Sequence, residues 1–152
     1  MVTFISHSPA DTQALGEEWG GHASSGLVIG LSGDLGAGKT QLVKGLARGL
    51  GFAGRVHSPS FGLVNEYTGG RFPLFHLDLY RLDTDQQIFA AGLEEYLEPA
   101  GVSVIEWVER WFDPASPEAT LPRGLLPQLY RSVRLETISE SVRRIQYEDF
   151  GA

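Results

Sequence analysis

The apolar positions of the first third of the chain predict two helices and a buried strand. A helix is expected to begin after Ser8, because a capping serine followed by Pro9 is typical of helix starts, and to end near residues 20–21. Residues 26–32 form an apolar run bounded by glycine, which is typical of a buried parallel strand. A second helix is predicted from Lys39 to about residues 49–51. Its apolar stripe at helical spacing consists of Leu42, Val43, Leu46 and Leu50.

The rest of the chain predicts four kinds of segment. Strands are expected over residues 61–67, 73–79 and 102–107, and a helix over residues 86–97. The segment 113–127 holds four prolines and is predicted to be a surface loop. Residues 132–138 and 141–150 are predicted to pair as a hairpin that closes one edge of the sheet. Because strands alternate with helices, we predict an α/β fold.

Composition narrows the classes of protein to which the chain could belong. Its 152 residues, 42% of them hydrophobic, suit one domain spanning residues 1–152. It has no cysteine, a start without a basic and apolar leader, and no apolar run near the roughly 18 residues of a membrane helix. We therefore expect a soluble, cytoplasmic protein with no membrane partner.

Charge makes nucleic-acid binding by bulk electrostatics an unfavourable hypothesis. The formal net charge is −7, so we expect no DNA partner. One group of arginines lies near the C-terminus: Arg131, Arg134, Arg143 and Arg144. We interpret them as the solvent face of the hairpin, with a local basic surface as the alternative.

A glycine-rich segment carries the strongest chemical signal. Residues 33–40 read GDLGAGKT and fit G-x-x-x-x-G-K-[ST] between a predicted strand and a predicted helix. Glycine leaves room for backbone N–H groups to converge on phosphate oxygens, and the helix N-terminus adds positive charge. The ammonium of Lys39 is predicted to reach the β- and γ-phosphates, and the hydroxyl of Thr40 to ligate Mg²⁺. The predicted nucleotide-binding loop consists of Gly33, Asp34, Leu35, Gly36, Ala37, Gly38, Lys39 and Thr40.

Two acids follow predicted strands and are candidates for handling the metal and the attacking water. Asp78 ends FPLFHLD and Glu106 ends VSVIE, and an apolar strand that ends in an acid resembles a Walker B element. We assign metal binding and orientation of water to Glu106, whose strand is the more apolar, and an outer role at the metal to Asp78. The segment 57–61, HSPSF, offers Ser58 and Ser60 as hydroxyls that could sense the nucleotide; an ordinary Ser-Pro turn is the alternative.

Four motifs, GDLGAGKT, SPSF, HLDLYRL and VIEWVER, occur in an order and at spacings that resemble the TsaE family of bacterial P-loop ATPases. The resemblance runs from about residue 12 to residue 110. It implies a P-loop NTPase-like, mostly parallel sheet flanked by helices, and hydrolysis of ATP with Mg²⁺ in support of the threonylcarbamoyladenosine (t6A) modification of tRNA. It also implies coupling to the TsaB and TsaD proteins, with TsaD performing the transfer and tRNA reached only through that complex.

The resemblance also assigns roles to individual residues. Lys39 and Thr40 match the phosphate and magnesium positions, and Asp78 and Glu106 match the acids of the family. Trp107 matches the tryptophan after the glutamate, where it would sense the nucleotide or pack in the core. Three further positions belong to the expected nucleotide site: Thr12 in the N-terminal segment, Arg143 near the C-terminus, and Ser60. The family usually has threonine where this chain has His57 and Ser60, and only Ser60 keeps a hydroxyl.

Other P-loop functions remain as alternatives. A small-molecule kinase needs an acceptor pocket and a lid, which the segment 113–127 could hide, and a nucleotide-binding adaptor would differ only in lacking turnover. A GTP-binding switch would carry Asn-Lys-x-Asp and Asp-x-x-Gly motifs, and neither is present. Because the motif includes no arginine finger, we expect slow hydrolysis that a partner stimulates.

Overall fold

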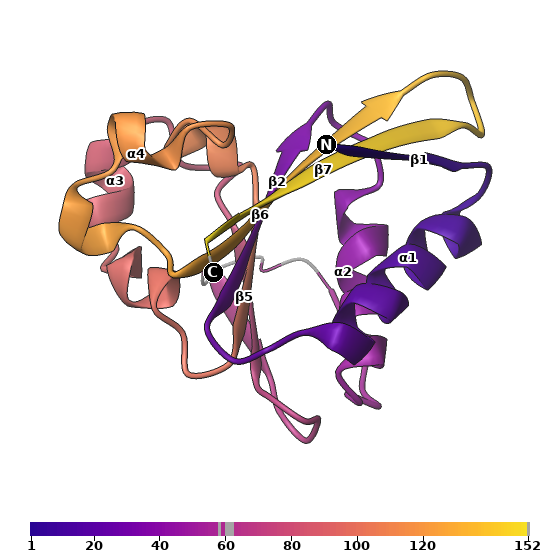
Figure 1. Cartoon of the computed structure of the whole chain (residues 1–152), viewed down its shortest axis with the longest axis horizontal. Helices are drawn as coiled ribbons and strands as arrows, with labels where there is room; N and C mark the ends of the chain where they lie inside the picture. Colours follow the sequence, from indigo (N-terminus) through magenta and orange to yellow (C-terminus); the bar gives the residue numbers. More distant parts are fainter. Residues whose placement is uncertain (58, 60–62, 152) are drawn as a thin grey trace.

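A computed structural model of the chain describes residues 1–57, 59 and 63–151, and within them one mixed sheet forms the centre of the fold (Figure 1). The strands lie in the order β1-β7-β6-β2-β5-β4-β3. Their bounds are Val2–Ser6 for β1, Leu27–Gly33 for β2, Val64–Tyr67 for β3, Leu74–Asp78 for β4, Val102–Glu106 for β5, Leu129–Thr137 for β6 and Arg143–Gly151 for β7.

The central strands β6, β2, β5 and β4 are parallel. At the edges, β3 pairs antiparallel with β4, β7 pairs antiparallel with β6, and β1 pairs antiparallel with β7. The register sets Leu31 of β2 beside Glu106 of β5, and Glu106 beside Asp78 of β4. Parallel strands bring their carboxyl ends to the same edge of a sheet, which is where ligands bind in open α/β folds. The sheet therefore places Glu106 beside β2 and Asp78 one strand further along the same edge, at which the glycine-rich loop begins.

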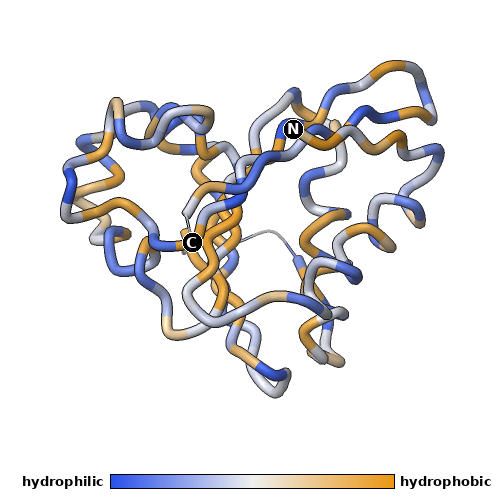
Figure 2. Tube along the Cα trace, viewed as in Figure 1, coloured by the Kyte–Doolittle hydropathy of each residue, from blue (hydrophilic) through white to orange (hydrophobic). Residues whose placement is uncertain are grey.

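Helices cover both faces of the sheet. Figure 1 shows α1 (Pro9–His22) and α2 (Lys39–Gly49) on one side, and α3 (Asp85–Ala90) and α4 (Pro117–Thr120) on the other. Three short 3₁₀ helices complete the described elements: η1 (Leu93–Leu97), η2 (Val108–Arg110) and η3 (Arg123–Leu125). Buried side chains form one cluster beneath α1 and α2 and a second on the opposite face, and Figure 2 shows hydrophobic residues concentrated along the central strands.

The α1–α2 pair packs at a separation that only glycine permits. A Cβ at Gly16 would overlap the carbonyl oxygen of Leu42, and a Cβ at Gly45 would overlap that of Gln13. The predicted apolar stripe of α2 is buried along its whole length, at Leu42, Val43, Leu46 and Leu50. α2 is thereby held firmly against α1 and the sheet, and its N-terminus carries the glycine-rich loop.

The predicted α/β class is confirmed, with three local differences. Strand β1 was not predicted, and it pairs outside the C-terminal hairpin, so β1 rather than the hairpin lies at that edge. The helix expected over residues 86–97 divides into α3 and η1, because Gly92 adopts a left-handed φ of 72° between them. The predicted loop 113–127 contains α4 and η3.

Two other predicted strands differ at their ends. The strand expected over residues 102–107 ends at Glu106, because Trp107 turns to a φ of 60°. The strand expected over residues 61–67 is described from Val64 onward, and residues 61 and 62 of that prediction lie outside the described residues. In the described part of the chain, the helices are too short or too polar to cross a membrane.

Candidate functional site

One pocket of about 450 Å³ gathers most of the predicted site residues. Residues 35–41 form one side of it, at the end of β2 and the start of α2. The residues that line it from other parts of the chain include Thr12, Asp78, Glu106, Trp107 and Arg143. Gly33 and Asp34 precede the lining segment, and Ser58 and Ser60 lie outside the described residues.

The glycine-rich loop turns through left-handed backbone conformations that favour glycine. Gly33, Gly36 and Gly38 have φ angles of 134°, 79° and 100°. Gly38 is the residue before α2, and no side chain of the described residues caps that helix start. The first N–H groups of α2 are thus available to a ligand, and the helix dipole favours an anionic one.

Lys39 is buried at the base of the pocket and held by two neighbours. Its ammonium donates a hydrogen bond to the carbonyl oxygen of Asp34 at 2.8 Å and lies 3.9 Å from the centre of the Trp107 ring. Burial lowers the pKa of Lys39 from its ordinary value, and the surrounding carboxylates, Glu109 and Glu106 foremost, oppose that shift. The structure therefore holds a partly desolvated cation beside the loop.

Trp107 reaches Lys39 because its backbone is left-handed. Among the described residues it is the one non-glycine residue with a positive φ. Such a conformation costs about 1–3 kcal/mol and persists only where surrounding contacts hold it. Here the Trp107 ring packs against Tyr80, with centroids 5.1 Å apart, and against the Lys39 ammonium.

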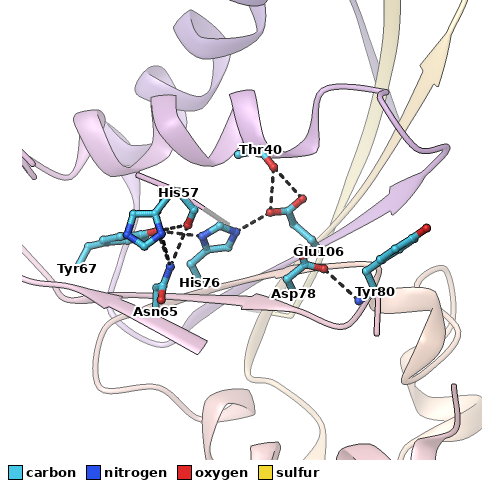
Figure 3. Close-up of polar contacts among 8 residues, drawn as sticks. All are labelled: Thr40, His57, Asn65, Tyr67, His76, Asp78, Tyr80 and Glu106. Atoms are coloured by element: carbon cyan, nitrogen blue, oxygen red, sulfur yellow. Dashed lines mark hydrogen bonds and ion pairs between the residues drawn. The ribbon is translucent and has the colours of Figure 1, made fainter. Parts of the chain in front are cut away.

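Glu106 is the most constrained acid of the site. The residue is 4% exposed, and its carboxylate accepts hydrogen bonds from the Thr40 hydroxyl at 3.2 and 3.3 Å. A second partner, His76 of β4, lies with its Nε2 2.5 Å from Glu106 Oε2 (Figure 3). The two residues that the sequence assigned to the metal, Thr40 and Glu106, are therefore in direct contact.

Asp78 points toward the same pocket from the neighbouring strand. Its carboxylate accepts a hydrogen bond from the Tyr80 N–H at 3.0 Å (Figure 3). Burial raises the pKa of Asp78 and the negative charge of Glu106 adds to the rise, whereas the Tyr80 N–H opposes it. Two acids of different environment thus face one cavity.

Thr12 and Arg143 bring the two ends of the chain to the pocket. The Ser6 hydroxyl donates to the Ser8 carbonyl at 2.8 Å, so the 2.7 Å contact between Ser6 and Thr12 requires Thr12 to donate to Ser6. Arg143 donates to the carbonyl oxygens of Ser139 at 2.8 Å and Gly36 at 3.4 Å, which joins the hairpin turn to the glycine-rich loop.

The other C-terminal arginines have acidic neighbours, and Arg134, which is exposed to solvent, lies 3.8 Å from Glu136. Arg131 forms an ion pair with Asp149 at 2.6 Å, and Arg144 forms one with Glu136 at 3.1 Å. Both pairs follow from the register of the hairpin, which sets these residues opposite each other. The geometry favours the interpretation of a solvent face over that of an open basic surface.

The oxygen atoms at the pocket suit a hard cation that a nucleotide helps to hold. Thr40, Glu106 and Asp78 all line it. No group of three or more His, Asp or Glu side chains that could hold a metal occurs in the described part of the chain. Mg²⁺ usually keeps several waters and binds one or two carboxylates together with substrate phosphates, so these residues fit it.

Comparison with known proteins identifies the family. The model of the family described as "Threonylcarbamoyl adenosine biosynthesis protein TsaE" matches residues 6–144. This chain belongs to the TsaE family. Curated TsaE proteins from Bacillus subtilis and Nostoc are 42% and 50% identical to it over 144 and 103 residues. The first alignment covers 95% of this chain and 83% of the relative; the second covers 65% and 63%.

A solved structure supports the same assignment. The crystal structure of YdiB from Bacillus subtilis superposes with a TM-score of 0.71 at 30% identity, covering 96% of this chain and 83% of that one. The TsaE relative from Synechocystis is 47% identical over 102 residues, and the alignment spans 64% of its length and 62% of this chain. The alignments with the two cyanobacterial relatives thus span less than two thirds of their length.

Sequence reasoning missed one residue that contacts the candidate site. His76 is fully buried and touches Glu106, yet the motif HLDLYRL was interpreted through Asp78 alone. A signal was present, because alternate residues of a strand share a face and His76 stands two positions before Asp78.

Proposed function

We propose that this TsaE-family protein binds and slowly hydrolyses MgATP in the pocket described above, in support of tRNA t6A biosynthesis. The observation that carries the proposal is the contact between Thr40 and Glu106 beside a glycine-rich loop whose helix N-terminus opens to the cavity. Relatives named as tRNA threonylcarbamoyladenosine biosynthesis proteins supply the biological context. A cytoplasmic location goes with that role.

Each residue has a task that its geometry supports. The N–H groups of the loop and of α2 receive the phosphates, and Lys39 neutralises charge that develops at the β,γ-bridge. Bound Mg²⁺ would neutralise phosphate charge, with the Thr40 hydroxyl as its ligand and Glu106 and Asp78 as nearby acids. Glu106, aligned by two hydrogen-bond donors, also orients the attacking water.

Turnover by the protein alone is expected to be slow. Lys39 and Arg143 are the cations among the described residues that line the pocket, and Arg143 is engaged with backbone carbonyls. A missing cationic finger costs on the order of 10³-fold or more in rate. We therefore propose that a complex of TsaB and TsaD stimulates hydrolysis, that TsaD carries out the threonylcarbamoyl transfer, and that tRNA is reached through this complex.

The two lysines of the chain provide a matched test. Lys39→Ala removes the buried ammonium at the loop, whereas Lys44→Ala removes a lysine of α2 that does not line the pocket. Measured with and without TsaB and TsaD, ATP hydrolysis should fall by at least about 100-fold in Lys39→Ala and stay near wild type in Lys44→Ala.

The same measurements distinguish the competing functions. Undiminished turnover in Lys39→Ala would refute the assignment. Tight ATP binding without turnover, both with and without TsaB and TsaD, would favour a nucleotide-binding adaptor. Calorimetry with ATP and GTP tests the alternative of a GTP-binding switch, which a strong preference for GTP would favour.

A further inference from the structure

His76 is a fully buried polar side chain that lies between Glu106 and the segment that follows α2, near His57 (Figure 3). Its Nε2 lies 2.5 Å from Glu106 Oε2, and its Nδ1 lies 3.1 Å from the hydroxyl of Tyr67 on β3. The Tyr67 hydroxyl is also 3.0 Å from the carbonyl oxygen of His57. A continuous chain of polar contacts thus runs from Glu106 through His76 and Tyr67 to His57.

Counting donors fixes the direction of the contact that matters. An ionised Glu106 carboxylate only accepts hydrogen bonds, so the Nε2 atom of His76 must carry the donated proton. In a neutral ring Nδ1 then accepts from the Tyr67 hydroxyl, while the amide of Asn65 donates to the His57 carbonyl at 2.9 Å. If Tyr67 instead donates to the His57 carbonyl, Nδ1 must donate to Tyr67, and His76 is then an imidazolium that donates from both nitrogens. Both arrangements leave Nε2 donating to Glu106.

The contact with His76 restricts the orientation of the Glu106 carboxylate. Its carboxylate receives the Thr40 hydroxyl from α2 and the His76 N–H from β4, two donors that come from separate elements. A buried imidazole without partners would destabilise the fold, whereas this one is satisfied at both nitrogens. The Tyr67 contact in turn disfavours rotation of the ring about its Cβ–Cγ bond, because rotation would break the contacts at both nitrogens.

We propose that His76 is a positioning residue for Glu106, itself oriented by Tyr67, and that it sets the carboxylate in the geometry needed to receive a magnesium-bound nucleotide. This inference rests on the proposed function of the pocket. Histidine and carboxylate pairs next to metal sites act in this way, and loss of the outer partner typically costs about 10- to 100-fold in metal affinity or activity.

The test uses the full chain and three variants. His76→Ala removes both contacts, His76→Gln keeps an amide N–H that can reach Glu106, and Tyr67→Phe removes only the hydroxyl that orients the ring. Ser103→Ala is the control, because Ser103 is buried in the adjacent strand β5 and its hydroxyl has no hydrogen-bond partner among the described residues. Thermal unfolding of each variant verifies that it folds.

Two readouts separate positioning from a merely structural role. Calorimetry with ADP, with and without Mg²⁺, gives the gain in affinity that the metal provides, and hydrolysis with TsaB and TsaD gives kcat and KM for ATP. We expect His76→Ala to reduce both the metal-dependent gain and kcat by about 10- to 100-fold, with metal-free ADP affinity within about twofold of wild type. His76→Gln should recover most of the loss, and Tyr67→Phe should lose severalfold.

The outcomes are decisive in either direction. A His76→Gln variant as impaired as His76→Ala, or both as active as Ser103→Ala, would overturn the positioning role while leaving the proposed function intact. A wild-type protein without turnover would overturn the proposed hydrolysis instead, and the calorimetric comparison would still decide the role of His76. If His76→Ala does not fold, the pair His76→Gln and Tyr67→Phe decides.

Discussion

At the scale of single residues, the site is arranged around charges that contacts within the protein hold in place. Lys39 rests on the face of Trp107 and on the carbonyl of Asp34, and Glu106 is fixed by Thr40 and His76. Ordered groups of this kind need little rearrangement when a nucleotide binds. The left-handed backbone of Trp107 is a local energetic cost of holding these groups in place.

The lowered pKa of Lys39 predicts how nucleotide binding depends on pH. Burial favours the neutral amine, so Lys39 loses its proton at a lower pH than the ordinary value of 10.5, whereas phosphate favours the charged form. Binding should therefore take up a proton in the alkaline range, and the affinity for ADP should fall as pH rises there, approaching about tenfold per pH unit. Calorimetry from neutral to alkaline pH measures this slope.

The control for this dependence is again the second lysine. Lys44→Ala should keep the alkaline loss of affinity, and Lys39→Ala should bind weakly with little further loss over the same range. An equal slope in Lys39→Ala would assign the dependence to another group.

Most of the site residues were predictable because their chemistry lies in contiguous motifs at strand ends. The loop 33–40, Asp78 and Glu106 come together since the carboxyl ends of parallel strands share an edge. His76 was not predicted, because its importance depends on the register that sets β4 beside β5 and on Tyr67 from the next strand. The local spacing places His76 on the same face of the strand as Asp78, but its contacts with Glu106 and Tyr67 are set by the pairing of the strands.

At the scale of elements, the contact between α1 and α2 determines where the loop sits. Gly16 and Gly20 on α1 face Gly45 and Gly49 on α2, with backbone against backbone. The four-residue spacing of each pair was visible in the sequence, yet glycine inside a helix is ordinarily unfavourable by about 1 kcal/mol, so the spacing alone did not predict a helix–helix contact. The close approach compensates for that cost.

Gly45→Ala tests this packing. The added Cβ would overlap the Gln13 carbonyl oxygen, and because the obstacle is backbone, α1 must shift. We expect the free energy of unfolding to fall by about 1–3 kcal/mol in urea denaturation. Gly21→Ala is the matched control, since the added Cβ would have nothing within 4 Å. It should raise the free energy of unfolding by about 0.5–1 kcal/mol. Equal stability of the two variants would contradict the packing argument.

Helices and strands with a clear hydrophobic pattern along the chain were predicted, whereas a strand that forms only by pairing with a distant segment was not. α1, α2 and the central strands follow from capping, stripe and apolar runs. Strand β1 is a short segment, VTFIS, that becomes a strand by pairing with β7, from the far end of the chain. α3 ends early because Gly92 follows it, a break that an uninterrupted helical pattern concealed.

At the scale of the whole molecule, the pocket is closed by both ends of the chain. β1 pairs with β7, α1 brings Thr12, and the turn after β6 brings Arg143 to the glycine-rich loop. A ligand in this pocket therefore contacts segments that are far apart in sequence and that come together only in the folded state. Its binding energy should add directly to global stability.

Thermal unfolding with MgADP measures that linkage. At a free ligand concentration of 100 times its Kd, binding to the folded state adds about 2.7 kcal/mol. For a chain of 152 residues each kcal/mol raises the Tm by about 2–4 °C, so the Tm should rise by about 5–10 °C. Lys39→Ala should show little shift, Lys44→Ala should match wild type, and the shift should grow with the logarithm of ligand concentration. A saturating nucleotide that binds by calorimetry without moving the Tm would mean that the pocket persists in a partly unfolded state, contrary to a site closed by the two ends of the chain.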